Sequence, residues 1–274
     1  MTGIPRIAIG RISYFIGDGK ASLRELAFAA ADRLGNAGGF GAVVAATFSS
    51  DERFPSLAVR IASRLGLPPS TPAFDLQMAC SAYPYALYLA GRIAADAGKD
   101  VLVVSGDAQT RFVDSSDHAT GGIFSDAATC TVVSAKGEGE SRFDFLSRCD
   151  EALLCPEAGP LRMDGMKVFT FVATEVSAFL KSFISRGRGP APDLFVPHQA
   201  NPYMVRQLAK SIGYADRFIA MDEGLKNPGG CSIPLAIAKA RESGILASGC
   251  ERALVAGFGA GFSAGAGIVS IDPA

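Results

Sequence analysis

The chain contains two similar segments, and this internal repeat constrains its fold more than any other feature. Residues 80–106 read CSAYPYALYLAGRIAADAGKDVLVVSG, and residues 231–257 read CSIPLAIAKARESGILASGCERALVAG. Both segments begin with Cys-Ser, continue through a helix-like run of Ala, Leu and Ile, and turn at a glycine, Gly98 or Gly249. Both end in a short apolar run closed by glycine. The spacing matches without a gap and indicates a duplicated unit.

A second pair of segments supports the duplication. FGAVVAATFSS followed by SLAVRIASRLG resembles PDLFVPHQANP followed by YMVRQLAKSIG. Each predicts a buried strand, a polar loop and an amphipathic helix, an alternation that favours an α/β fold with mostly parallel sheets covered by helices. We therefore expect two similar βαβ-type halves, 1–135 and 166–274. Residues 136–165 read as an irregular loop that forms a pocket wall or lid, with a plain surface connection as the alternative.

Composition is that of a soluble enzyme rather than a disordered or fibrous chain. Of the 274 residues, 49% are hydrophobic and 19% are charged, and no apolar stretch reaches membrane-spanning length without a charge, Gly or Pro. The start, MTGIPRIAIG, lacks the features of a signal peptide, so we expect a cytoplasmic protein. The net charge of −1 argues against nucleic-acid binding.

Neither a cofactor nor a metal is expected. The six cysteines form no CxxC pair, and with only two histidines, His118 and His198, a Cys/His metal site would be hard to assemble. The run GFGAGFSAGAG lacks the third glycine and the following helix of a dinucleotide fingerprint. GFSAG within it resembles a nucleophile elbow, but no histidine follows Ser263. We interpret these glycines as main chain that packs closely against another part of the molecule.

Three polar residues stand in loops where α/β folds place their chemistry. Cys80 follows AFDLQMA, His198 follows DLFVP, and Asn227 precedes the second-half helix in LKNPGGCSIP. A cysteine at a helix N-terminus is stabilised as the thiolate, and nucleophilic cysteine chemistry needs a histidine nearby in space. Taken singly, each residue also fits a structural role as a buried cysteine, a loop histidine or a turn asparagine.

Together, these residues resemble the β-ketoacyl-acyl carrier protein (ACP) synthase III family of condensing enzymes. QMACSAYPYAL, VPHQANP, KNPGGCSIPLAIA and GFGAGFSAG occur in the family's order and cover nearly the whole chain. The resemblance implies the thiolase fold, a duplicated five-layered α-β-α-β-α sandwich, and a triad of Cys80, His198 and Asn227. It also implies acyltransferase chemistry: Cys80 is acylated by a thioester, and a malonyl thioester then condenses with loss of CO2 to give a β-ketoacyl thioester.

The resemblance assigns roles to further residues. The N–H groups of Cys80 and Ala260 would form an oxyanion hole, while neutral His198 and the Asn227 amide would stabilise the enolate without a metal. Phe54 matches a phenylalanine that reaches into the partner subunit's acyl pocket, which implies a homodimer, and Phe169 would lie near the pantetheine entrance. Core or interface packing is the alternative for both phenylalanines.

Two basic residues are expected to bind the acidic carrier protein. Arg206 and Lys210 lie one turn apart on the helix after VPHQAN, although a solvated helix face would show the same pattern. His118 aligns with an arginine that contacts coenzyme A in typical members, and we interpret it as a loop residue.

The chain also departs from the family. It is shorter than typical members and lacks the segment with a tryptophan and arginines that holds coenzyme A; it has no Trp at all. This favours an ACP-linked donor or a more open tunnel, and a specialised pathway of fatty-acid or polyketide biosynthesis. The alternatives are an acyltransferase that uses an alcohol or amine acceptor and a supporting subunit of a heterodimeric synthase. Retention of Asn227 favours condensation, because simple acyl transfer forms no enolate. Cys231, in the second repeat, is expected to be structural.

Overall fold

A computed structural model describes residues 4–35, 38–118, 120–187, 189–221 and 223–273. Its first elements are β1 (Ile4–Ile16), α1 (Leu23–Leu34), β2 (Ala42–Ala46), α2 (Leu57–Arg64), β3 (Ala73–Leu76), α3 (Ala82–Ala97), β4 (Val101–Asp107) and β5 (Ala127–Asp150). They are followed by β6 (Leu153–Leu154), β7 (Arg162–Met163), α4 (Gly165–Phe171), α5 (Ser177–Ser185), β8 (Leu194–Pro197), α6 (Pro202–Ser211), α7 (Ser232–Glu242), β9 (Cys250–Gly259) and β10 (Gly261–Ile271).

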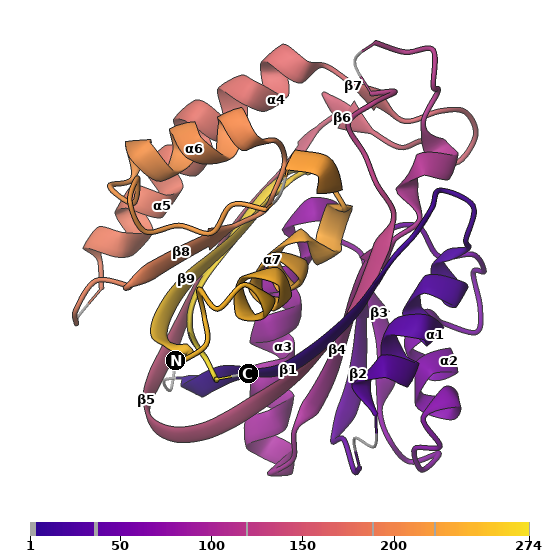
Figure 1. The fold of residues 1–274 in the computed structure, drawn as a ribbon, viewed down its shortest axis with the longest axis vertical. Helices are drawn as coiled ribbons and strands as arrows, with labels where there is room; N and C mark the ends of the chain where they lie inside the picture. The colour runs from indigo at the N-terminus through magenta and orange to yellow at the C-terminus, as the bar shows by residue number, and fades with distance from the viewer. Residues whose placement is uncertain (1–3, 36–37, 119, 188, 222, 274) are drawn as a thin grey trace.

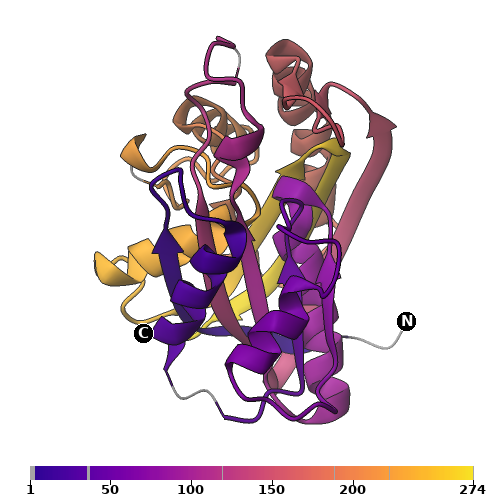
Figure 2. The ribbon, with the colours of Figure 1, turned by 90° about the vertical axis from the view of Figure 1, so that its right-hand side faces the viewer.

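These elements stack in five layers. In Figure 1, α4, α5 and α6 cover one outer face and α1 and α2 the other, while α3 and α7 lie between two layers of strands. The view from the side of α1 and α2 shows both helices in front of the strands of the first half (Figure 2). Three apolar clusters fill the spaces between layers, and the central cluster combines residues of α3, α7 and strands from both halves. The five-layered α-β-α-β-α arrangement is therefore confirmed.

The strand order supports the duplication. The strands lie in the order β3-β2-β4-β5-β1-β10-β9-β8, and β5 pairs with β10 as well as with β1. The first half thus reads β3-β2-β4-β5-β1, and the second reads β8-β9-β10-β5, with a single bridge at Phe218 beside β8 in place of β3. In the first half β2 runs parallel to β4, and β4 runs antiparallel to β5. In the second half β8 likewise runs parallel to β9, and β9 runs antiparallel to β10. The long strand β5 serves both halves.

Two expectations about the sheets need correction. The sheets are mixed rather than mostly parallel, because β5 runs antiparallel to β1, β4 and β10. Residues 136–150, expected to be loop, belong to β5. The alternating rings of Phe143 and Phe145 in RFDFL pack on Tyr85 and Tyr88 of α3. The charged residues mixed among them hid this strand pattern in the sequence. The boundary at 135 lies inside β5, and the division into 1–135, 136–165 and 166–274 remains a proposal.

The two repeats correspond with a one-residue offset. A 3₁₀ turn precedes each central helix, Ala79–Ser81 before α3 and Gly229–Cys231 before α7. Ala79 (φ +43°) and Gly229 (φ +66°) open these turns in the left-handed region, so Gly230, not Cys231, occupies the place of Cys80. Pro84 and Pro234 then coincide as the third residues of the two helices, where an absent N–H costs little.

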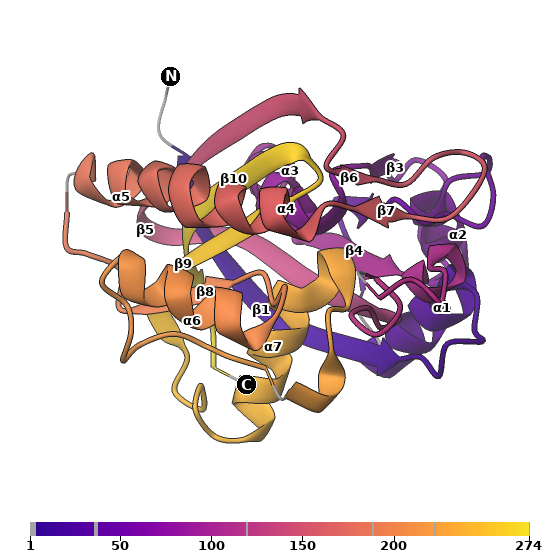
Figure 3. The same cartoon turned by 90° about the horizontal axis from the view of Figure 1, so that it is seen from above.

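Local sequence explains the helix starts that position the later residues. Asn201 caps α6 by accepting the Met204 N–H at 2.8 Å, and Pro202 occupies the first helical position. In α4, the Asp164 carboxylate accepts the Lys167 N–H at 3.0 Å, and Figure 3 shows β7 leading into this helix.

One helical run among the described residues, 165–185, passes the length and composition test for a membrane span. It consists of α4, a π-helical turn (Val172–Val176) and α5. Phe171, Leu180 and Phe183 on this run are buried in the outer apolar cluster. Apolar residues on one side of this run pack onto the interior of the protein, which is a reason for its hydrophobic composition.

Candidate active site

Cys80, His198 and Asn227 line one cavity of about 310 Å³. They come from the turn before α3, the end of β8 and the loop before α7, and their exposed fractions are 7%, 2% and 6%. Most other lining side chains are apolar: Ile123, Phe124, Leu153, Met163, Val168, Phe169, Val172, Met204 and Phe258. The cavity therefore surrounds three polar residues with an apolar wall, as small-molecule sites usually do.

Glycines in β9 allow the main chain to approach Cys80. A Cβ atom on Gly259 would lie only 2.8 Å from the Cβ of Cys80, and one on Gly257 would lie 3.1 Å from its carbonyl oxygen. The first distance is shorter than real Cβ contacts, and the second is tighter than most of them. The expected close packing of the glycine run is thus seen, and the segment it meets is the Cys80 turn.

The resting Cys80 side chain is a neutral thiol. Burial raises its pKa to about 12, and the charge of Asp107 adds to the increase. The N-terminus of α3 favours the thiolate, but the loss of hydration is the larger effect here. Burial therefore outweighs the stabilisation of the thiolate that the helix start predicts.

His198 is neutral and fixed from one side. Burial lowers its pKa to about 3. Its Nδ1 lies 2.7 Å from the hydroxyl of Ser232, which also accepts the Gln199 N–H at 3.3 Å. Among the described residues, the Ser232 hydroxyl hydrogen has Nδ1 as its one acceptor, so we assign the proton of the imidazole to Nε2. His198 then offers a hydrogen-bond donor at Nε2.

The orientation of Asn227 follows from its contacts. Its Oδ1 accepts the Gly229 N–H at 2.9 Å, so the amide nitrogen is the end left for another partner. Its backbone forms a parallel bridge with Phe124, with the Asn227 N–H donated to Ile123 and the Ser125 N–H donated to Asn227. The site therefore contains two neutral donors, His198 Nε2–H and the Asn227 amide.

Backbone strain marks the same two places. Within the described chain, the non-glycine residues with positive φ are Ala79 (φ +43°) and Lys226 (φ +51°). Each directly precedes a residue of the cavity, Cys80 or Asn227. Such conformations cost about 1–2 kcal/mol each and cluster at functional sites.

Of the other residues predicted for the site, Phe169 lines this cavity, whereas Ala260 and Phe54 do not. Phe169 stacks on Tyr203, with ring centroids 6.1 Å apart. Ala260 lies in the turn between β9 and β10 and lines a separate open groove. Phe54 lies in the loop before α2 with 85% of its surface exposed.

The charged and loop residues lie on the surface. Arg206 and Lys210 are exposed on α6, whose first turn lines the cavity through Met204. His118 lies exposed in a turn after β4. No group of three or more potential metal-binding side chains occurs among the residues described.

Sequence reasoning missed three residues that hold the site together. Ser232 orients His198, and Gln109 donates to the carbonyl of Asn227 at 2.7 Å. Asp107 is fully buried and accepts the Gly230 N–H at 3.1 Å as well as hydrogen bonds from the loop that begins at residue 47. Burial raises the pKa of Asp107 to about 6. Gly259, which contacts Cys80, belongs to the glycine run that the sequence did predict to be closely packed.

Cys231 has a structural environment. It is fully buried, and its thiol lies 3.1 Å from the carbonyl oxygen of Pro228. Burial raises its pKa well above the ordinary value. The contacts are those expected of a packed, unreactive cysteine.

Comparisons with known proteins agree with the fold. Residues 74–150 match the family model for 3-oxoacyl-[acyl-carrier-protein (ACP)] synthase III, and residues 191–271 match the model for its C-terminal part. A β-ketoacyl-[acyl-carrier-protein] synthase III of Rhodospirillum rubrum is 32% identical over 250 residues, 84% of this chain and 76% of that protein. A β-ketoacyl-[acyl-carrier-protein] synthase III 2 of Deinococcus radiodurans is 34% identical over 247 residues, 83% and 72% of the two chains.

A solved structure gives the same answer. The 3-oxoacyl-(acyl carrier protein) synthase III of Pseudomonas aeruginosa PAO1 superposes with a TM-score of 0.88 at 27% identity, covering 97% of this chain and 98% of that one. The fold is thus that of the thiolase-like, acyl-transferring condensing enzymes. Within this class, the chain belongs to the β-ketoacyl-ACP synthase III family, as its motifs predicted.

Proposed function

We propose that the protein forms a β-ketoacyl thioester in two half-reactions, with Cys80 as nucleophile and His198 and Asn227 as hydrogen-bond donors. The observation that carries this proposal is the shared cavity, in which a thiol and two neutral donors stand within an apolar wall. The family's chemistry requires these groups and no metal.

In the first half-reaction, Cys80 sulfur attacks the carbonyl carbon of an acyl thioester. The bond to the donor sulfur breaks, and the Cys80 proton ends on the departing thiol, so no net base is consumed. The N–H groups of Cys80 and Ala260 are proposed to bind the transient oxyanion. The absence of a side chain at Gly259 supports the role of Ala260, because it lets the main chain next to Ala260 pack directly against Cys80.

In the second half-reaction, a malonyl thioester loses CO2 and leaves an enolate. His198 Nε2–H and the Asn227 amide donate to the enolate oxygen while its carbon attacks the acyl group on Cys80. Cys80 departs as thiolate and takes up a proton. A neutral His198 suits this step, because it can donate without introducing a charge that would have to be desolvated.

Intact-mass measurement after incubation with acyl-ACP and with acyl-CoA tests this assignment. We expect an acyl adduct on the wild type that is absent in Cys80→Ala. No adduct from any donor would favour a supporting subunit of a heterodimeric synthase. An adduct transferred to an alcohol or amine, without CO2 release from malonyl-ACP, would favour the simple acyltransferase.

We propose acyl-ACP and malonyl-ACP as the substrates, in a specialised pathway of fatty-acid or polyketide biosynthesis. Arg206 and Lys210 lie on α6 close to the cavity wall and would attract an acidic carrier protein. Phe169, stacked on Tyr203, would border the path of the pantetheine arm.

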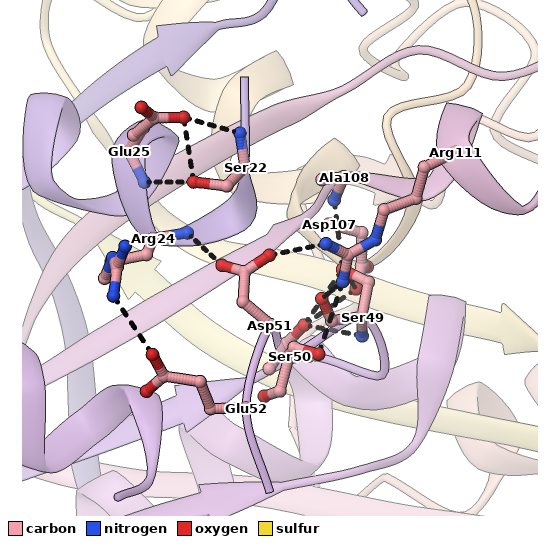
Figure 4. Close-up of polar contacts among 11 residues, drawn as sticks. Ser22, Arg24, Glu25, Ser49, Ser50, Asp51, Glu52, Asp107, Ala108 and Arg111 are labelled. Atoms are coloured by element: carbon pink, nitrogen blue, oxygen red, sulfur yellow. Dashed lines mark hydrogen bonds and ion pairs between the residues drawn. The ribbon is translucent and has the colours of Figure 1, made fainter. Parts of the chain in front are cut away.

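We also propose a homodimer. The strand β3 forms one edge of the sheet, and unpaired edges are sites of strand addition. The loop before α2 is anchored by Asp51, which accepts hydrogen bonds from Arg111 and from the Arg24 N–H, and by Arg24 binding Glu52 (Figure 4). This anchoring leaves Phe54 exposed and available to a second copy.

Sedimentation at several concentrations tests the dimer, and a monomer throughout would contradict it. A related synthase as the partner would instead appear as association only after mixing the two proteins. A cytoplasmic location completes the proposal.

A further inference from the structure

Gln109 is a buried amide outside the proposed triad. It lies in a short 3₁₀ turn after β4 and exposes 1% of its surface. Its Nε2 donates to the carbonyl oxygen of Asn227 at 2.7 Å and to that of Ser125 at 2.9 Å. Both hydrogens of this nitrogen are thus donated to carbonyl groups of the two segments that pair at Asn227.

The contact with Asn227 crosses between the halves of the molecule. Gln109 belongs to the first half, together with the turn that carries Cys80, whereas Asn227 belongs to the second. The bridge between Phe124 and Asn227 is short. Among the described residues, its segments are also joined by the Asn227 N–H to Ile123, the Ser125 N–H to Asn227 and the Ser125 hydroxyl to the carbonyl of Leu225. Loss of the Gln109 amide would remove one donor from the buried carbonyl of Asn227 and one from the partly buried carbonyl of Ser125.

Gly229 extends the influence of Gln109 to the Asn227 side chain. A Cβ on Gly229 would lie 3.1 Å from Gln109 Oε1 and 2.8 Å from Asp107 Oδ2, so the main chain rests directly on these two side chains. The N–H of Gly229 is the donor to Asn227 Oδ1. Gln109 therefore contacts both the backbone of Asn227 and the residue that orients its amide.

We infer that Gln109 is a positioning residue that holds the Asn227 amide at the distance from Cys80 required for condensation. The inference rests on the proposed function, in which Asn227 acts only after Cys80 is acylated. It follows that a change at Gln109 slows decarboxylative condensation and spares acylation of Cys80. A residue that merely stabilises the fold would affect both half-reactions alike.

The test compares Gln109→Met with Thr110→Val in the full-length protein. Methionine has similar length and no donor. Thr110 lies in the same turn and donates to Asp126 rather than to Asn227, so it is a matched control for loss of a side-chain hydrogen bond. Acylation is followed by intact mass with acyl-ACP, and condensation by CO2 release from malonyl-ACP on the preacylated protein.

We expect Gln109→Met to acylate within about twofold of the wild type and to release CO2 about tenfold to a hundredfold more slowly, since small misplacements of reacting groups are costly. Thr110→Val should leave the ratio of the two rates unchanged. Equal losses in both half-reactions, an unchanged CO2 rate, or the same selective loss in Thr110→Val would each overturn the inference.

Two further measurements keep the test decisive. If Gln109→Met does not fold, Gln109→Glu, which retains the shape but loses the amide hydrogens, must show the same selective loss. The wild type is measured first. Absence of CO2 release from the acylated wild type would refute the proposed function itself. Normal CO2 release by the wild type together with an unaffected Gln109 variant would refute only the positioning role of Gln109.

Discussion

Replacement of Gly259 by alanine should slow acylation of Cys80. The new Cβ would lie 2.8 Å from the Cβ of Cys80, whereas ordinary contact begins at 3.4 Å, so the two segments must separate by about 0.6 Å. Because the neighbour is the Cys80 Cβ itself, the nucleophile moves relative to the proposed oxyanion hole. A misplacement of about 1 Å can cost roughly a hundredfold in rate, so we expect a loss of about tenfold to a hundredfold.

The assay is the time course of the Cys80 acyl adduct by intact mass under single-turnover conditions. Overpacking should also lower stability by about 1–3 kcal/mol, measurable by denaturant unfolding. Gly38→Ala is the control, because a Cβ there meets no atom within 4 Å. Gly259→Ala that acylates as fast as Gly38→Ala would refute the argument that close approach of this strand positions the nucleophile.

Three further predictions concern the histidine and the carrier surface. Burial holds the pKa of His198 at about 3, against 6.5 in the unfolded chain, so the stability contributed by the neutral imidazole is present above pH 6.5 and is lost as the pH falls. Between pH 7.5 and 5, the free energy of unfolding of the wild type should therefore fall by about 2 kcal/mol more than that of His198→Gln in denaturant titrations. Equal losses in both proteins would contradict a buried, neutral imidazole. Ser232→Ala should slow CO2 release about fivefold, the equivalent of one hydrogen bond of about 1 kcal/mol, while acylation of Cys80 stays normal; equal effects on both steps would exclude a role through His198. Charge reversal at Arg206 and Lys210 should raise the KM for acyl-ACP about tenfold without changing the rate with a small acyl thioester, and unchanged steady-state kinetics with the carrier protein would remove this surface from the account.

The layered fold could be predicted from the sequence because its determinants are local. The continuous apolar run of β2 and the helices that end at Gly98 and Gly249 are readable from periodicity and turn residues. Strand direction was not readable in this way: β5 depends on pairing with β1, β4 and β10, whose positions the sequence does not specify. Residues 136–150 were expected to be loop for a different reason: charged residues mixed with the aromatic ones hide the alternation of a strand.

The repeat shows both the strength and the limit of pattern matching. Two Cys-Ser pairs suggested that Cys80 and Cys231 are equivalent, but backbone torsions place Gly229 opposite Ala79. The sequence alignment followed residue identity, whereas the residue in the left-handed region that opens each turn determines which backbone positions correspond.

The candidate site divides in a similar way. Cys80, His198 and Asn227 could be found because they stand in distinctive motifs, and the structure brings them to one cavity. Gln109 and Ser232 were missed, since their roles are hydrogen bonds between segments distant in sequence. The protonation state of Cys80 also required the structure, because burial cannot be judged from a helix start alone.

The central claim is tested most directly by CO2 release from malonyl-ACP on protein preacylated at Cys80, compared between the wild type and Asn227→Asp. Aspartate keeps the size of the side chain, but its carboxylate cannot donate to the enolate oxygen. The account predicts CO2 release with formation of a β-ketoacyl product in the wild type, and a rate about a hundredfold to a thousandfold lower in the variant despite normal acylation. Equal CO2 release by both acylated proteins, or none from the wild type, would contradict it.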